Sequence, residues 1–294
     1  MRPLRGIMFK LGSVLIFIVM ASLIKAAHMP AGQSVFFRSF FAIPVILGWL
    51  ALRGELATGF RVASPFGHFL RGFAGTTAMG LGFAGLAYLP LPEVTAIGYA
   101  APLLTVIFAA MFLGEEVRLF RISCVALGMT GVLIVLWPNL SAQAVATLGA
   151  VLVLTGAVFS ALAQIFVRKL VMTEKTPAIV FYFSLTSTLL SLLTIPFGWV
   201  MPSAGQAALL VAAGVLGGFG QILLTSSYRW ADASLVAPFD YASMIFALLI
   251  GYFIFAEVPS LTMLAGAALV ILAGVLIIFR ERRLGIERAK AMTL

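Results

Sequence analysis

The chain has 294 residues, of which 62% are hydrophobic and only 10% are charged, and its formal net charge is +9. A soluble domain has about 45–50% apolar residues and roughly a quarter charged residues, so this composition excludes soluble, disordered and nucleic-acid-binding chains and indicates a polytopic membrane protein. The single cysteine, Cys124, excludes an internal disulfide.

Ten apolar segments follow one another along the chain, separated by short connections that contain Pro, Gly, Asn or charged residues. A helix needs about 20 such residues to cross a bilayer. The segments are 8–26, 34–52, 67–88, 93–113, 120–137, 148–167, 177–200, 206–228, 234–256 and 261–279. The pattern predicts an all-α integral membrane protein with ten transmembrane helices.

The basic residues indicate the orientation of these segments. Apart from Lys25, Arg38 and Arg71, all 19 Lys and Arg residues lie in the N-terminal tail, after even-numbered segments or in the C-terminal tail. Connections that carry Lys and Arg stay on the cytoplasmic side of a membrane. We therefore expect an inner-membrane protein with both termini in the cytoplasm.

The two halves of the chain resemble each other. Residues 112–117 (Phe-Leu-Gly-Glu-Glu-Val) close the fourth segment, and residues 253–258 (Phe-Ile-Phe-Ala-Glu-Val) close the ninth. Because each half has five segments, an odd number, the second half must enter the membrane with the opposite topology, as in many secondary transporters. The predicted units are a repeat at 8–137, an inverted repeat at 148–279 and a basic cytoplasmic tail at 280–294.

Several motifs in the first half match a known family. They are Phe36-Phe37-Arg38-Ser39-Phe40, Leu70-Arg71-Gly72, the run from Tyr88 to Glu93, Ala101-Pro102-Leu103, residues 112–117 and Gly128-Met129-Thr130-Gly131-Val132. With Lys25 at the end of the first segment, they resemble the EamA-domain branch of the drug/metabolite transporter (DMT) superfamily. The resemblance implies a ten-helix transporter of small organic metabolites. It also implies a central cavity lined mainly by the first, third and fourth helices of both repeats.

Asp240 is a charged residue well inside a predicted helix, about 10 Å from the cytoplasmic end at 1.5 Å per residue. A charge at this depth is costly and faces a cavity or a partner. Asp240 is therefore a candidate for contact with a substrate amine or for proton coupling, or it is a packing anchor. Pro238 and Pro102 each remove a backbone donor and can expose a carbonyl group to a cavity.

Lys25 and Arg38 lie near the predicted outer ends of their segments. Either they extend to the interface, or one of them attracts a substrate carboxylate or phosphate or pairs with Glu93, itself a second candidate for proton coupling. Arg71, near an inner helix end, is interpreted as an interfacial anchor. Four uncharged polar residues can line a cavity or join helices by hydrogen bonds: Tyr99, Gln164, Gln221 and Tyr241.

Other classes of function lack their motifs. The sequence has no phosphate-binding loop for ATP hydrolysis, no H-E-x-x-H motif or other catalytic cluster, and no group of His or Cys residues spaced for a metal. We therefore expect no enzyme activity, no metal and no cofactor, and interpret the chain as a secondary transporter that works by alternating access.

A mixed polar lining suits an amino acid or a similar zwitterion. Flavins, other nitrogenous metabolites, carboxylates and cationic drugs remain open as substrates, as does a channel-like or assembly subunit. A proton or a counter-substrate supplies the energy, or the substrate moves down its own gradient. A monomer and a homodimer are both compatible with the short loops.

Overall fold

The computed structural model describes residues 3–56, 59–60, 62–113, 119–141, 144–170, 173–230 and 237–291. Within these residues every regular element is a helix. The elements in the first half are α1 (Pro3–Ala27), α2 (Ala31–Phe40), α3 (Ala42–Leu52), α4 (Pro65–Gly85), α5 (Leu91–Gly98), α6 (Ala100–Leu113) and α7 (Leu119–Ser141). Those in the second half are α8 (Ala144–Leu170), α9 (Thr176–Leu192), η1 (Ile195–Phe197), α10 (Ala204–Trp230), η2 (Ala237–Tyr241), α12 (Ala242–Phe255) and α13 (Leu261–Ala291).

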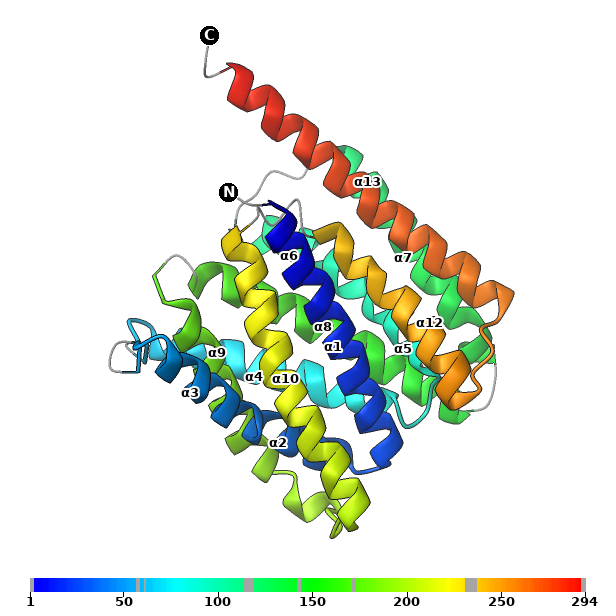
Figure 1. Ribbon diagram of the computed structural model, residues 1–294. Helices are drawn as coiled ribbons and strands as arrows, with labels where there is room; N and C mark the ends of the chain where they lie inside the picture. Colours follow the sequence, from blue (N-terminus) through cyan, green and yellow to red (C-terminus); the bar gives the residue numbers. More distant parts are fainter. Residues whose placement is uncertain are drawn as a thin grey trace.

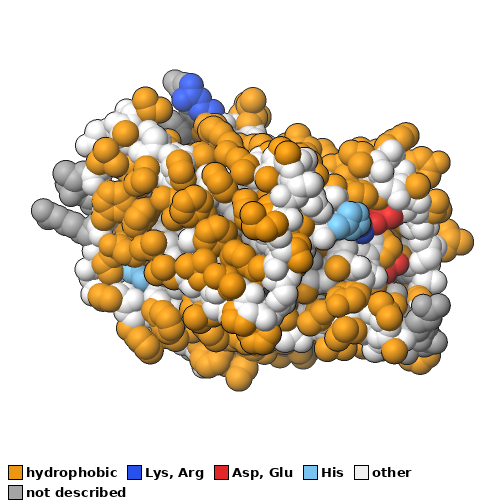
Figure 2. Space-filling view, turned by 90° about the horizontal axis from the view of Figure 1, so that it is seen from below, with side chains coloured by type: hydrophobic (Ala, Val, Ile, Leu, Met, Phe, Trp, Pro, Cys, Tyr) orange, Lys and Arg blue, Asp and Glu red, His pale blue; other side chains and the backbone are white. Residues whose placement is uncertain are grey.

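The predicted all-α membrane protein is confirmed. Six helical stretches of the described chain are long and apolar enough to cross a bilayer, and three more apolar helices are somewhat shorter. Large hydrophobic side chains are exposed along most helices, and Figure 2 shows them over most of the visible face. A soluble monomer rarely exposes a continuous apolar surface of this extent, so this surface contacts lipid.

Several predicted segments are not single helices but contain two helical elements, because prolines interrupt their hydrogen bonding. α2 ends at Phe40 and α5 ends at Gly98, each four residues before a proline, Pro44 and Pro102. A proline nitrogen cannot donate the bond that the carbonyl four residues earlier would accept. The ninth segment begins with the 3₁₀ helix η2, which contains Pro238.

Helices of the two halves pack against each other in a reciprocal pattern. α1 lies along α10, and α4 lies along α8, so the first helix of each half contacts the third segment of the other half (Figure 1). Contacts also join α2 to α9, α5 to α12 and α7 to α13, which are the second, fourth and fifth segments of the two halves. α1 begins and α13 ends at the same end of the bundle (Figure 1).

Two tyrosines at corresponding breaks meet where the halves join. Tyr99 lies between α5 and α6, and Tyr241 is the last residue of η2, directly before α12. Their rings are 5.1 Å apart at an interplanar angle of 69°. The Tyr99 hydroxyl is 2.5 Å from the hydroxyl of Ser243. Both rings are buried, so this contact fixes the two interrupted helices to each other.

Glycines allow α7 and α13 to approach closely. A Cβ atom added at Gly131 would lie 2.7 Å from the carbonyl oxygen of Gly266, and one added at Gly266 would lie 2.6 Å from the carbonyl oxygen of Gly131. Small residues at such positions let helix backbones come together in membranes.

We expect Gly131→Ala to lower the melting temperature of the detergent-purified protein. The added methyl group meets backbone, which cannot rotate away, and overpacking of this kind costs about 1–3 kcal/mol, or about 2–4 °C for each 1 kcal/mol. Gly48→Ala on α3 is the matched control, because no atom lies within 4 Å of its added Cβ. Equal melting temperatures for the two variants would contradict the close packing of α7 and α13.

Candidate functional site

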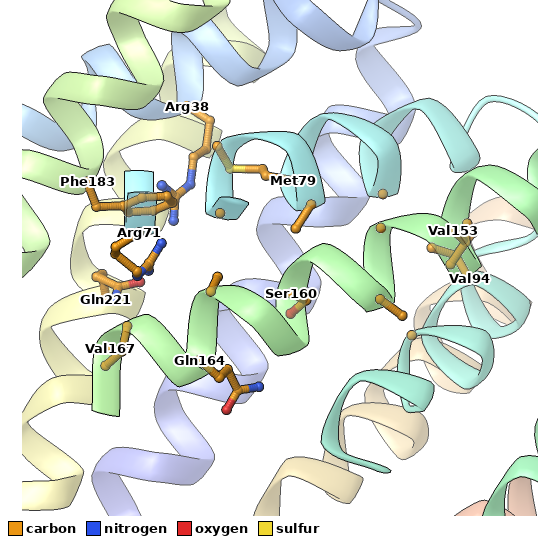
Figure 3. Close-up of a pocket in the computed structure, with 17 residues that line it drawn as sticks. Arg38, Arg71, Met79, Val94, Val153, Ser160, Gln164, Val167, Phe183 and Gln221 are labelled. Atoms are coloured by element: carbon orange, nitrogen blue, oxygen red, sulfur yellow. The ribbon is translucent and has the colours of Figure 1, made fainter. Parts of the chain in front are cut away.

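A cavity of about 360 Å³ lies between the two halves of the chain (Figure 3). Its lining comes from α2, α4 and α5 of the first half and from α8, α9 and α10 of the second half. Most of the lining side chains are small or apolar, and the polar ones are Arg38, Arg71, Ser160, Gln164 and Gln221. The cavity includes the second segment of each half, α2 and α9, which the family resemblance did not imply.

Two arginines line this cavity near the ring of Phe183 on α9. Arg38 belongs to α2 and Arg71 belongs to α4. The guanidinium carbon of Arg71 is 4.0 Å from the centre of the Phe183 ring, and that of Arg38 is 5.5 Å from it. Figure 3 shows both side chains extending toward this ring. A cation near the face of an aromatic ring is attracted to it, so Phe183 helps to hold both groups in place.

Several nitrogen atoms of these arginines are buried without a hydrogen-bond partner. They are Nε of Arg38 and both Nε and Nη1 of Arg71. Gly75 makes room for Arg71, since a Cβ atom at Gly75 would overlap Nη1 of that arginine. Both arginines line the cavity, and these donors have no hydrogen-bond partner among the described residues.

No acidic side chain of the described chain lines the cavity or forms an ion pair with Arg38 or Arg71. The acidic residues that form ion pairs do so with other bases: Lys10–Asp240, Lys25–Glu257, Arg53–Glu55 and His68–Glu174. The cavity therefore has a positive potential, which attracts anions.

Three of the predicted substrate-binding residues line the cavity: Arg38, Gln164 and Gln221. The amide groups of the two glutamines and the hydroxyl of Ser160 can donate and accept hydrogen bonds. Tyr99, Asp240, Tyr241 and Lys25 lie outside the lining.

Arg71 lines the cavity, although the sequence predicts an interfacial anchor at this position. That prediction follows from its place seven residues into α4. The sequence feature that could have indicated this position is the pair Arg71 and Gly75, which lie one helical turn apart. The glycine leaves space on the same face of α4 as the arginine.

Lys25 joins α1 to the other half. Its ammonium group is 2.5 Å from Glu257 and donates a hydrogen bond of 2.9 Å to the carbonyl of Leu89. The second carboxylate oxygen of Glu257 accepts a hydrogen bond of 2.9 Å from the backbone N–H of Leu91. The partner of Lys25 is thus Glu257 rather than Glu93, which lies in the first turn of α5.

Asp240 forms a second ion pair with α1. Its carboxylate is 2.7 Å from the ammonium group of Lys10, whose side chain is only 2% exposed, whereas that of Asp240 is 46% exposed. Both ends of α1 are therefore joined to the ninth segment by an ion pair. Pro238 lies in η2 beside Asp240, and Pro102 faces outward from α6.

Glu174 connects two loops outside the membrane-spanning helices. One of its carboxylate oxygens accepts hydrogen bonds of 2.7 and 2.8 Å from the backbone N–H groups of Ala63 and Ser64. That oxygen is also 3.5 Å from Nε2 of His68. Burial alone would raise the pKa of Glu174, but the two N–H donors and His68 outweigh it, and the pKa is lowered below its ordinary value.

Residues 4–137 and 147–280 each match the model of the EamA-like transporter family. The chain belongs to this family. The resemblance seen in the sequence is thus confirmed, and this EamA-like protein is a transporter rather than an enzyme.

Three relatives of this EamA-like protein carry names that describe transport. The S-adenosylmethionine uptake transporter of Rickettsia prowazekii is 29% identical over 251 residues, which cover 85% of this chain and 84% of the relative. The pseudopaline exporter CntI of Pseudomonas aeruginosa is 31% identical, over 91% of this chain and 94% of the relative. The riboflavin transporter of Vibrio cholerae is 30% identical, over 92% of both chains. These names support a small molecule as the substrate.

A crystal structure that is 20% identical aligns with a TM-score of 0.68, over 95% of this EamA-like chain and 98% of the other. At this identity the match shows the fold alone. It indicates that the helical arrangement is shared over nearly the whole length of both proteins.

We expect Glu174→Gln to lower the melting temperature at neutral pH by about 2–4 °C, corresponding to about 1 kcal/mol. Because folding lowers the pKa of Glu174, its ionised carboxylate stabilises the fold above the ordinary glutamate pKa of about 4.3. That contribution is lost as the pH falls through the folded-state pKa. The difference between wild type and variant should therefore shrink on acidification. Glu55→Gln, which removes a carboxylate from a partly exposed ion pair, is the control and should have little effect.

Proposed function

We propose that the protein is a secondary transporter that moves an amino acid or a similar small zwitterion across the cytoplasmic membrane by alternating access. The observation that carries this proposal is the cavity whose lining, with five polar side chains, comes from both halves of the chain. A site between two repeats changes its access when the repeats rock against each other.

The packing of the helices supports two inverted five-helix repeats at 8–137 and 148–279. The first segment of each half packs on the third segment of the other, and like segments pair at the second, fourth and fifth positions. The contact between Tyr99 and Tyr241 joins two corresponding helix breaks. Such reciprocal contacts are expected of two units related by a pseudo-two-fold axis.

The side chains of the cavity suit a zwitterion. Arg38 and Arg71 provide donors for a carboxylate, and the oxygens of Ser160, Gln164 and Gln221 can accept hydrogen bonds from an ammonium group. The relatives are named for uptake as well as for export, and for different substrates, so similarity alone selects neither a direction nor a compound.

The orientation that we propose places both termini in the cytoplasm, with residues 280–294 as a basic tail. It follows from the distribution of Lys and Arg between alternate connections. The start of α1 and the end of α13 lie at one end of the bundle (Figure 1), which agrees with an even number of membrane crossings.

The ion pair of Lys10 with Asp240 is the proposed element of proton coupling, with Glu93 as the second candidate. Asp240 is half-exposed whereas Lys10 is buried, so a proton can reach the carboxylate from solvent. Protonation would neutralise the partner of a buried cation and weaken the connection between α1 and the ninth segment.

Uptake by proteoliposomes tests the transport mechanism. We expect accumulation of a labelled amino acid from a library to saturate with concentration and to be accelerated by unlabelled substrate inside the vesicles, because an alternating-access carrier returns faster when loaded. Uptake that rises linearly and shows no exchange would instead indicate a channel.

We expect Asp240→Asn to abolish or shift the pH dependence of this uptake, because the variant cannot take up a proton at the ion pair. Since the change leaves Lys10 buried without its counter-ion, the double variant Lys10→Met with Asp240→Asn should be compared, as it removes both charges. Glu55→Gln is the control for loss of a carboxylate elsewhere. An unaltered pH profile in both Asp240 variants would exclude coupling at this residue.

A further inference from the structure

Arg38 and Arg71 are the charged groups of the cavity, and the proposed function does not by itself explain why there are two. We propose that they form a subsite for two carboxylates, so that the substrate is a small dicarboxylic metabolite, such as an amino acid with an acidic side chain. This inference rests on the proposed transport function and assigns its substrate class.

Electrostatics provide the first argument. Charged side chains within a membrane protein are costly unless they are paired. Lys10 and Lys25 in α1 each have an acidic partner, but no acidic side chain among the described residues forms an ion pair with Arg38 or Arg71. Two cations near one phenyl ring also repel each other, and a monocarboxylate would neutralise only half of their charge. A ligand with two negative charges completes the site.

The geometry of the two side chains provides the second argument. A guanidinium group is planar and presents its N–H donors along its edge, where they match the two oxygens of a carboxylate. The Phe183 ring lies against both groups, and unpaired donors remain on each: Nε of Arg38, and Nε and Nη1 of Arg71. Each arginine can therefore bind its own carboxylate while it stays in contact with the ring.

The remaining walls limit the size and polarity of the ligand. About 360 Å³ is near the lower end of the 300–1,000 Å³ range of ligand pockets. Val94 and Val153 provide apolar surface away from the arginines (Figure 3), which suits a short hydrocarbon chain between or beside the carboxylates. Cationic drugs do not fit a cavity with this charge.

Ligand binding to the purified protein tests the assignment independently of transport. The probes are the unbranched dicarboxylates from malonate to adipate, together with L-aspartate and L-glutamate. Each amino acid is compared with its amide, L-asparagine or L-glutamine, which has almost the same shape but one carboxylate fewer. We expect L-aspartate or L-glutamate to bind about 10- to 100-fold more tightly than the matched amide. Glycerol 3-phosphate and inorganic phosphate are the phosphate probes.

Variants then place the binding at the two arginines. Arg38→Gln and Arg71→Gln should each weaken binding of the acid by about 10- to 100-fold, to the level of its amide. Arg71→Lys keeps the charge but cannot bind a carboxylate through two donors, so its loss should be smaller. Arg53→Gln, which removes a cation from a loop outside the cavity, should bind the acid as the wild type does.

A pair of glycine variants on α4 tests the geometry without any change of charge. Gly75→Ala displaces the end of the Arg71 side chain and crowds Phe183, whereas the added Cβ at Gly80 lies 3.8 Å from its nearest neighbour. We expect Gly75→Ala to lose the preference for the acid and Gly80→Ala to keep it. The displaced group is the flexible end of a side chain, so the fold should tolerate both changes.

Each outcome supports or overturns one of the two proposals. If no acid binds better than its amide, or if the arginine variants bind acids as the wild type does, the dicarboxylate subsite is excluded. Preferential binding of the phosphate probes would exclude the carboxylate assignment. If the acid binds at the arginines but proteoliposomes neither accumulate nor exchange it, the subsite stands and the transport function fails. If another metabolite is exchanged normally by Arg38→Gln and Arg71→Gln, transport stands and the subsite fails.

Discussion

The hydrocarbon core of a bilayer offers no partner for a backbone N–H or C=O group, and the structure is organised by that constraint. In the described residues, helices satisfy these backbone groups. Helices are interrupted inside predicted segments near Phe41, Tyr99 and Tyr241. The last two interruptions face each other, where the hydroxyls of Tyr99 and Ser243 lie 2.5 Å apart. These two interruptions are thus buried between the two halves.

The same constraint separates the charged residues of the membrane region into two groups. Lys10 and Lys25 each extend from α1 to an acidic residue of the other half, Asp240 and Glu257. These pairs hold the halves together and neutralise the buried charge. Arg38 and Arg71 instead turn toward a cavity and have no acidic partner among the described residues. Their burial within the membrane is costly for stability, and the proposed ligand would offset that cost.

Much of this arrangement could be predicted from the sequence because bilayer physics acts on local composition. Segment length, the distribution of Lys and Arg, and the prolines that end α2 and α5 depend on residues within one helix or loop. Arg38, Gln164 and Gln221 were identified because a polar residue within an apolar segment is conspicuous.

The contacts between segments could not be predicted in the same way. The partner of Lys25 is Glu257, more than two hundred positions away in the sequence, whereas Glu93 is much nearer along the chain. Arg71 was misplaced because its distance from the helix end was known, but the face that α4 presents to α9 was not. Such contacts depend on how helices rotate and pack, which hydropathy does not encode.

The cavity is asymmetric although the helices around it are arranged reciprocally, and the asymmetry bears on mechanism. Both arginines belong to the first half, on α2 and α4, whereas the ring that they contact, Phe183, belongs to α9 of the second half. In the proposed alternating-access cycle, a movement of one half against the other would change the distance between the guanidinium groups and this ring. A carboxylate bound to the arginines would move with the first half. The free energy of its binding would then depend on the distance between Phe183 and the guanidinium groups. In the proposed cycle, the contact between Arg71 and Phe183 would therefore connect substrate binding physically to the relative position of the two halves.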